Sequence, residues 1–533
     1  MNLRLTGGEM QVWSDLDGQH GPGPVRGTVL TPLLAAASGR TAVVGPLDPA
    51  LLDAVPADDL TLLVRGLPDA ETLAARLADR PGITVLCGGP EKLAGEPAYD
   101  TVIALDGLER LGSTEGADLT WDDTFALLAA TLRPGGRLLL AAENHLGLHR
   151  LAALPPDVTD SDWADAGEYD PDRPAGLARF QFRLARAGLV VTRTYAAWPT
   201  PLAPTALVSA ELSADPEAIG FLQATLGRAI GSPAEALTDP GRLAARALRH
   251  GAAVDLAPGW ILLAEQADAG ADPAVAPGRD GWFAAPAGRP ATPGSPAAAA
   301  SLPEALIAIG DDRFDVVPRP GGGLVLRRPD AVPTPVPVGR TLEDLLIVAS
   351  LRHDLPTVRE LLHRWQAGRH AGVPADQVVA TRGGELNPLT PAGSPPAALR
   401  RLAGRLLDAG LAHLWPSPAD PAELAQTLAA LAGRASEPVA PGDVAPERPD
   451  ARAYRELRTD RDRLSRELAE AREREAWYER TLAEREVELR RARGIIALVS
   501  GTPTARAGKL VLAGARRARR TAGAAVRRVL PRD

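Results

Sequence analysis

The stretches AYDTVIALDGLERL (residues 98–111) and LRPGGRLLLAAEN (residues 132–144) decide the fold class of this chain. Each contains a continuous apolar run of strand length, and a segment with helical spacing lies between them. Pro134 cannot continue that helix, and Gly135 can adopt the positive φ of a tight turn. Continuous apolar strands that alternate with helices predict a parallel sheet that is buried on both faces.

The same alternation extends over the first half of the chain. Between the apolar runs, helical spacing is clear at residues 69–79 and 121–132. We therefore predict an α/β fold with a Rossmann-like, doubly wound domain, followed by a mainly helical domain and a C-terminal coiled coil. The predicted strands are TAVV (41–44), LTLLV (60–64), ITVL (83–86), TVIAL (101–105), RLLLAA (137–142), LVVTRTY (189–195) and WILLA (260–264).

Composition divides the chain into six parts, because 533 residues are too many for one hydrophobic core. Two segments rich in Pro, Ala and Gly have no periodic pattern and predict linkers. The predicted parts are a Rossmann-like domain (1–268), a linker (269–300), a mainly helical domain (301–433), a second linker (434–450), a coiled coil (451–496) and a basic tail (497–533).

Cysteine content and charge narrow the class of protein. Cys87 is the single cysteine, which excludes an intramolecular disulfide framework and a thiolate-rich metal site. We find neither a secretory leader pattern nor an apolar run long enough to span a membrane, so we expect a cytoplasmic protein. Residues 505–533 carry a net charge of +8, which leaves −16 of the chain's −8 on residues 1–504. A basic tail on an acidic body indicates that the tail contacts something anionic.

The segment from Leu457 to Ile496 has heptad spacing. Nine of its twelve a and d positions are apolar, and the residues between them are largely charged. This pattern predicts a coiled coil and hence a homo-oligomer; a solvated single helix is the alternative. The tail at 497–533 pairs arginines with Ala, Val and Leu, which favours an interfacial helix on an anionic membrane surface. A solvated tail and nucleic-acid binding are the alternatives, but the tail has no interleaved aromatics and the body is acidic, so we expect no specific nucleic acid.

The order of motifs from Asp100 through Glu109 to the L-x-P-G-G-x-L segment at 132–138 resembles the fourth and fifth strands of class I S-adenosylmethionine-dependent methyltransferases. Residues 143–148, ENHLGL, are similar to a segment of the subgroup that accompanies bacterial surface-polysaccharide glycosyltransferases. So is LAPGW at 256–260. An Ala, Arg, Pro and Gly bias agrees with a GC-rich bacterial genome.

This resemblance implies transfer of a methyl group from S-adenosylmethionine to a glycan or glycolipid-linked sugar. A carboxylate at the C-terminal end of a strand could serve as general base toward a sugar hydroxyl. The protein would then work at the inner membrane face, with its tail as a peripheral anchor. The residues that the resemblance marks are Glu143 and Asn144 as catalytic, and Gly45, Asp48, Glu91, Asp106 and Glu109 as cofactor-binding.

The chain also departs from the family's pattern where the cofactor would lie. The loop after the first strand has one glycine, Gly45, and two prolines in place of a glycine-rich loop. The second strand ends in Arg65, where the family has an acid that accepts hydrogen bonds from the ribose hydroxyls. The third strand lacks the usual acid, and Glu91 could substitute for it. An alternative function is therefore an inactive, oligomeric scaffold that recruits partners of glycan synthesis.

Several residues also have a purely structural interpretation. Asp48 could be an N-cap with Pro49 in the first helical position, and Glu109 could be an exposed helix residue. His145 and His149 have the spacing of two metal ligands on a helix, but no third ligand is evident, so we predict no metal site.

Overall fold

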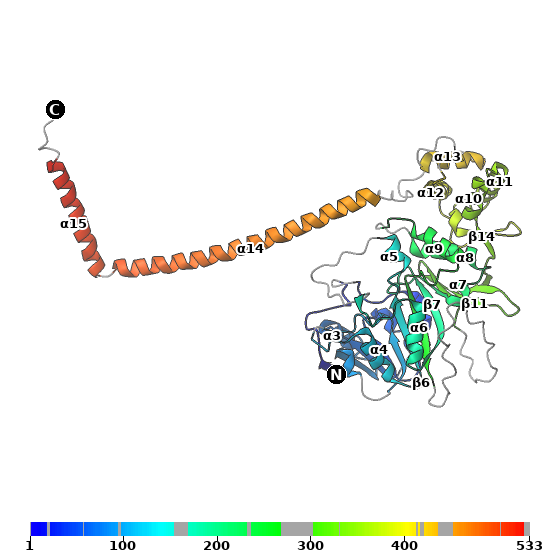
Figure 1. Cartoon of the computed structure of the whole chain (residues 1–533), viewed down its shortest axis with the longest axis horizontal. Helices are drawn as coiled ribbons and strands as arrows, with labels where there is room; N and C mark the ends of the chain where they lie inside the picture. Colours follow the sequence, from blue (N-terminus) through cyan, green and yellow to red (C-terminus); the bar gives the residue numbers. More distant parts are fainter. Residues whose placement is uncertain are drawn as a thin grey trace. The chain divides into compact units, whose positions relative to one another are not determined.

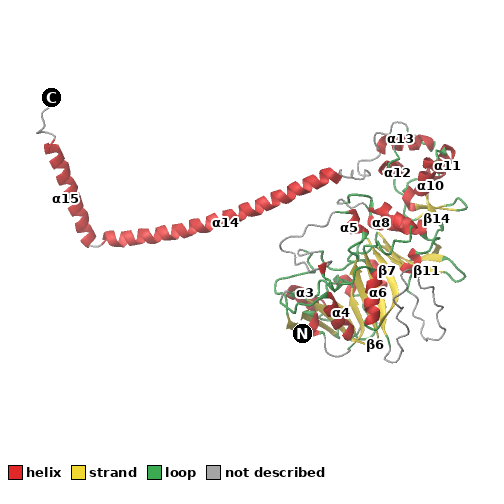
Figure 2. Cartoon of the chain, viewed as in Figure 1, coloured by secondary structure: helices red, strands yellow, loops and turns green. Residues whose placement is uncertain are grey.

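The protein is represented by a computed structural model that describes residues 2–18, 22–56, 58–93, 98–113, 115–153, 169–231, 236–267, 302–329, 331–411, 414–415, 421–434, 451–501 and 503–526. Residues 1–446 form one compact unit and residues 447–533 a second. A sheet of 13 strands organises the first unit (Figure 1, Figure 2). Its strand order is β1-β4-β3-β2-β5-β6-β9-β7-β8-β10-β11-β12-β13.

Seven of these strands form a Rossmann-like core. Counted along the chain, their order in the sheet is 3-2-1-4-5-7-6, and the strand at position seven runs antiparallel to both neighbours. This is the order expected of the methyltransferase fold that the sequence resembles, and all seven coincide with predicted strands. The core strands are β2 (Thr41–Val44), β3 (Leu60–Val64), β4 (Ile83–Gly88), β5 (Tyr99–Ala104), β6 (Leu132–Glu143), β7 (Leu189–Trp198) and β9 (Gly259–Gln266).

Helices cover both faces of the core because alternate strand residues point to opposite faces. Val43 belongs to the hydrophobic cluster that also holds residues of α1, α2 and α3, whereas its neighbour Val44 belongs to the cluster that holds residues of α4 and α6. Both valines are at most 3% exposed. These helices are α1 (Thr31–Ala35), α2 (Pro49–Leu52), α3 (Leu67–Arg76), α4 (Trp121–Ala130) and α6 (Leu177–Arg186).

The turn expected at Pro134 and Gly135 is a bulge at the start of β6. Leu132 pairs with Tyr99 and Arg137 pairs with Thr101, so residues 133–136 lie opposite a single residue of β5. Gly135 has a φ of 73°, as the tight turn requires.

The boundary expected at residue 301 does not separate two folds. Four strands after it extend the first sheet, because β10 pairs with β8 and β11–β13 follow in antiparallel order. The part expected to be mainly helical therefore begins as sheet. At the opposite edge β1, which the sequence pattern did not predict, pairs with β4. These strands are β1 (Leu3–Gly7), β8 (Ala206–Ser209), β10 (Ala305–Ile309), β11 (Asp312–Pro318), β12 (Leu324–Arg327) and β13 (Thr334–Pro335).

Helices dominate the rest of the first unit, around a small sheet in the order β14-β15-β16. Helix α8 crosses this sheet at Gly220, where a Cβ would lie 2.2 Å from the carbonyl oxygen of Gly339. The remaining elements are α5 (Leu148–Ala152), α7 (Ala210–Ser213), α8 (Ile219–Ile230), α9 (Pro240–Arg249), β14 (Gly339–Thr341), α10 (Leu342–Leu351), α11 (Leu355–Gln366), β15 (Val378–Thr381), β16 (Leu386–Pro388), α12 (Pro395–Asp408) and α13 (Pro421–Leu431).

The second unit consists of two helices, α14 (Ala451–Gly501) and α15 (Pro503–Val526). The predicted linker at 269–300, most of the linker at 434–450 and the tail beyond residue 526 lie outside the described residues. Among the described residues, no helix combines the length and the apolar composition that crossing a membrane requires.

Candidate functional site

Doubly wound sheets bind ligands where the strand order reverses, at the C-terminal ends of the strands. Here that switch point lies between β2 and β5, which are followed by Gly45 and Asp106. Gly45 has a φ of 89°, and a Cβ on it would lie 3.1 Å from the Cβ of Asp106 and 3.4 Å from Leu111 Cδ2. The crevice at the switch point is therefore occupied by the protein's own side chains.

Asp106 is turned toward Arg110 and away from solvent. The Nε of Arg110 donates to Asp106 Oδ2 at 2.9 Å, and its Nη2 donates to the carbonyl oxygen of Gly23 at 2.8 Å. Burial raises the pKa of Asp106 to about 7, although the charge of Arg110 acts in the opposite direction. The expected cofactor-binding residue thus serves an internal ion pair.

A segment near the N-terminus, residues 10–18 and 22–25, lies across the ends of β2 and β3; we call it the covering segment. Its first residue, Met10, donates its backbone N–H to the carbonyl oxygen of Arg65 at 2.9 Å and accepts from the N–H of Leu67 at 3.0 Å. At its other end, Val25 donates to the carbonyl oxygen of Pro46 at 3.0 Å and accepts from the N–H of Asp48 at 2.9 Å. Backbone hydrogen bonds therefore hold the segment over the loops where a cofactor would bind.

Within the covering segment, Asp15 forms a buried, bidentate ion pair with Arg65. The Nε and Nη2 of Arg65 donate to the two carboxylate oxygens at 2.8 and 2.7 Å, and both side chains are 2% exposed. Burial would raise the pKa of Asp15, but the hydrogen bonds and charge of Arg65 outweigh it and lower that pKa. The indole of Trp13 lies against the guanidinium and donates to Asp15 Oδ1 at 3.0 Å.

The residues at this edge do not fit S-adenosylmethionine. A ribose in this position presents hydroxyl groups that need an acceptor, and Arg65 only donates. Its remaining Nη1 donates to the carbonyl oxygen of Gly112 at 3.1 Å, so its donors face the protein. A Cβ on Gly66 would lie 2.2 Å from the carbonyl oxygen of Trp13, which shows how closely the covering segment packs on the end of β3.

Two other expected cofactor-binding residues have different surroundings. Asp48 is the N-cap of α2: its Oδ1 accepts from the N–H of Ala50 at 2.8 Å, and Pro49 follows in the first turn. This is the structural interpretation of Asp48. Glu91 lies in a 3₁₀ turn after β4, and its Oε2 is buried without a hydrogen-bond partner among the described residues. Glu91 is thus the one expected residue at this edge with an unused acceptor.

Glu109 and Glu143 belong to a charged cluster beside the covered edge. Arg173, whose side chain is 4% exposed, donates through Nε to Glu109 Oε1 at 2.6 Å and through Nη2 to the carbonyl oxygen of Glu143 at 2.8 Å. The carboxylate of Glu143 receives His149 Nε2 and Arg150 Nε, each at 2.9 Å. Burial would raise the pKa of Glu143, but these two partners lower it to about 2. A carboxylate with this pKa is a poor general base near neutral pH, because it binds protons weakly.

Asn144, the second expected catalytic residue, has a structural role. Its amide donates to the carbonyl oxygens of Asp255 and Ala257 at 2.7 and 2.8 Å, and its Oδ1 accepts from the N–H of Leu146 at 3.1 Å. With 3% of its surface exposed, it ties the end of β6 to the loop before β9. Both amide hydrogens are used, so none remains for a substrate.

The residues that sequence reasoning missed are the partners of these side chains: Asp15, Arg110 and Arg173. An arginine at the end of a buried strand indicates that an acid must lie nearby, because an unpaired buried charge is costly. The sequence does not reveal which acid, since Asp15 lies 50 positions from Arg65.

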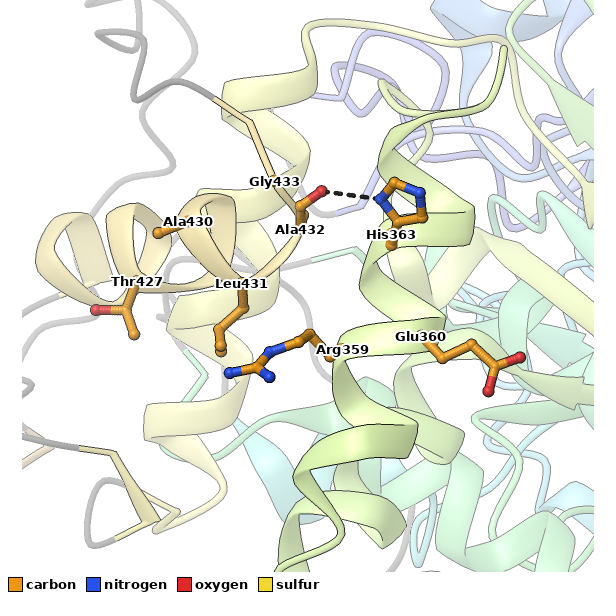
Figure 3. A pocket seen from close by; sticks show the side chains of 8 residues that line it. All are labelled: Arg359, Glu360, His363, Thr427, Ala430, Leu431, Ala432 and Gly433. Atoms are coloured by element: carbon orange, nitrogen blue, oxygen red, sulfur yellow. Dashed lines mark hydrogen bonds between the residues drawn. The ribbon is translucent and has the colours of Figure 1, made fainter.

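A larger hollow, of about 700 Å³, lies away from the sheet edge between α11 and α13 (Figure 3). Arg359 and His363 line one side and Thr427 and Leu431 the other, and His363 Nδ1 lies 3.3 Å from the carbonyl oxygen of Ala432. Over the described part of the chain, no three His, Cys, Asp or Glu side chains gather closely enough to hold a metal ion.

No family model and no curated protein matches this sequence. Among solved structures, the chain is similar to an S-adenosylmethionine-dependent methyltransferase from Mesorhizobium loti (15% identity, TM-score 0.25) and to the N-methyltransferase NodS from Bradyrhizobium japonicum (10% identity, TM-score 0.25). It is also similar to a sarcosine dimethylglycine methyltransferase from Galdieria sulphuraria (13% identity, TM-score 0.23). Each match covers 45% of this chain and 98%, 93% and 82% of the respective neighbour.

Proposed function

We propose that this chain is a methyltransferase-like protein without methyl-transfer activity, which works as an oligomeric scaffold. The observation that carries the proposal is the buried Asp15–Arg65 pair, which stands where the cofactor's ribose would need an acceptor. Opening this site would expose or separate two buried charges, and the breaking of such a pair costs about 3–5 kcal/mol. Methyl transfer would have to recover that free energy from cofactor binding.

The candidate ligand of the scaffold is a glycan or glycolipid-linked sugar. This class comes from the sequence resemblance to the polysaccharide-associated subgroup. The cluster around Glu109, Glu143 and Arg173 supports it, because it places carboxylates and guanidinium groups, which bind sugar hydroxyls, beside the covered edge. In this proposal these groups bind the sugar and do no acid–base chemistry.

Assembly is assigned to α14. Its heptad positions include Leu464, Leu468, Leu482 and Leu489, which are 52–65% exposed in the single chain. A helix of 51 residues with such a row of apolar side chains buries them by pairing with another helix of the same kind. A second copy of this chain is the natural partner, and the basic tail would hold the oligomer at an anionic membrane surface.

The test of lost activity is calorimetric titration of S-adenosylmethionine into the full chain. We expect no binding tighter than tens of micromolar, which corresponds to about −6 kcal/mol. The matched control is Arg179→Gln, which changes an exposed arginine on α6 and leaves the covered edge intact. Submicromolar affinity, together with methyl transfer to a glycan acceptor, would overturn the proposal.

An active methyltransferase remains the second candidate because of one observation. The Oε2 of Glu91 is a buried acceptor without a partner, at the strand end where the family binds adenine. If the titration shows tight binding, Glu91→Gln should weaken it, whereas it should change nothing in a protein that does not bind the cofactor.

A further inference from the structure

A cleft of about 280 Å³ lies between α9, α10 and β14, in the part of the first unit that follows the Rossmann-like core. Helix α12 contributes one side chain to it. Guanidinium groups dominate its lining: Arg242, Arg246, Arg249, Arg340 and Arg405.

Two of the five arginines are neutralised by acids. Arg405 pairs with Glu343 through Nε, and its Nη1 lies 3.4 Å from Asp239 Oδ2. Arg249 Nη1 lies 3.1 Å from Asp344 Oδ2. Glu343 and Asp344 are the acids that line the cleft, so its lining carries five positive and two negative charges.

The other three arginines have no such neighbour. No hydrogen bond or ion pair joins the side chain of Arg242, Arg246 or Arg340 to another residue in the described part of the chain. Arg242 and Arg246 are one helical turn apart on α9, where like charges destabilise a helix by a few tenths of a kcal/mol. A cleft that gathers three uncompensated guanidinium groups attracts an anion, because the low-dielectric walls strengthen the field inside it.

We infer that this cleft binds a soluble small molecule that carries a phosphate or diphosphate group. Guanidinium groups match phosphate oxygens in bidentate geometry, and this match makes arginine the preferred residue for phosphate recognition. Ile347 and Val348 form an apolar wall that suits the organic part of such a ligand. The volume lies near the lower limit of small-molecule sites, about 300 Å³, which favours a compact ligand. A phospholipid headgroup has the same chemistry, but the cleft is recessed between elements of the folded body.

The experiment is calorimetric titration of inorganic pyrophosphate into the full chain at low ionic strength. We expect saturable binding with one site per chain that persists in addition to any weak association with the basic tail. The double variant Arg246→Gln/Arg340→Gln should weaken this binding at least tenfold. Both side chains are exposed and have no partner among the described residues, so the melting temperature without ligand should not change. Arg179→Gln removes one exposed arginine of α6 and should leave the affinity unchanged.

Three outcomes would overturn the inference. The first is the absence of saturable pyrophosphate binding. The second is an equal affinity in the double variant, which would assign the binding to another basic surface such as the tail. The third is a chain that ignores pyrophosphate yet loses binding to vesicles of anionic phospholipid through the same double variant, which would identify a lipid headgroup as the ligand.

Discussion

Replacing Asp15 by alanine is the most direct perturbation of the covered edge. The substitution leaves the guanidinium of Arg65, which is 2% exposed, without its carboxylate. One carbonyl oxygen, that of Gly112, remains as a partner. Removing one member of a buried ion pair costs about 3–5 kcal/mol, because the other charge stays buried and uncompensated. We expect this cost to appear as easier opening of the covering segment.

Amide hydrogen exchange measures that opening. The N–H groups of Met10 and Leu67, which bond the covering segment to the end of β3, report on it directly. A loss of 3–5 kcal/mol corresponds to a fall in protection of about 10² to 10³·⁶, at 1.4 kcal/mol for each factor of ten. Amides of α12 provide the internal control, since that helix belongs to a different hydrophobic cluster.

The double variant Asp15→Leu/Arg65→Met completes the cycle. It removes both charges and keeps apolar volume, and such replacements are often neutral or stabilising. Protection of Met10 should therefore return toward that of the parent chain. A fall of less than tenfold in Asp15→Ala, or an equal loss in the double variant, would show that the ion pair does not hold the covering segment in place.

Three further predictions concern other parts of the chain. The pKa of Glu143 is lowered from its ordinary 4.5 to about 2, so its contribution to stability is present above pH 4.5 and is lost as the pH falls toward 2; Glu143→Gln should flatten acid unfolding in this range when it is followed by tryptophan fluorescence. The full chain should sediment as a dimer or trimer, and Leu468→Asp with Leu482→Asp should make it a monomer, because these substitutions put charges in the apolar seam. An unchanged sedimentation coefficient would argue against pairing through α14. Full-length protein should float with anionic liposomes at low salt, whereas a chain that ends at 496 should not; equal flotation of the two would exclude the tail as the anchor.

The core strands could be predicted because they are buried on both faces and therefore appear as continuous apolar runs. LTLLV at 60–64, for example, is buried throughout. By contrast, β1 is an edge strand with exposed Arg4 and Leu5, so its pattern resembles a loop. The strand β10 was assigned to the wrong part of the chain because its partner, β8, lies about 100 residues earlier, across a linker.

Prediction of the site reached as far as each residue's own chemistry. Arg65 and the single Gly45 showed that the cofactor cradle departs from the family's pattern, and both lie where the pattern placed them. What fills the cradle could not be predicted, because it depends on a contact between Asp15 and Arg65 that only the folded chain creates. Likewise, the role of Asn144 follows from carbonyl groups of the backbone, which leave no trace in the identity of side chains.

The pairing of β10 with β8 affects where the chain can be cut. A protein that ends at residue 268 would lose the strand beside β8 and expose an open edge whose free N–H and C=O groups can pair with another molecule. It would also lose Glu304, which binds Arg193 and Ser209, and the carbonyl of Pro303, which accepts from Tyr195 Oη at 2.6 Å. Recombinant expression of the Rossmann-like part alone should therefore yield aggregates, and a soluble fragment should extend at least to the end of β13.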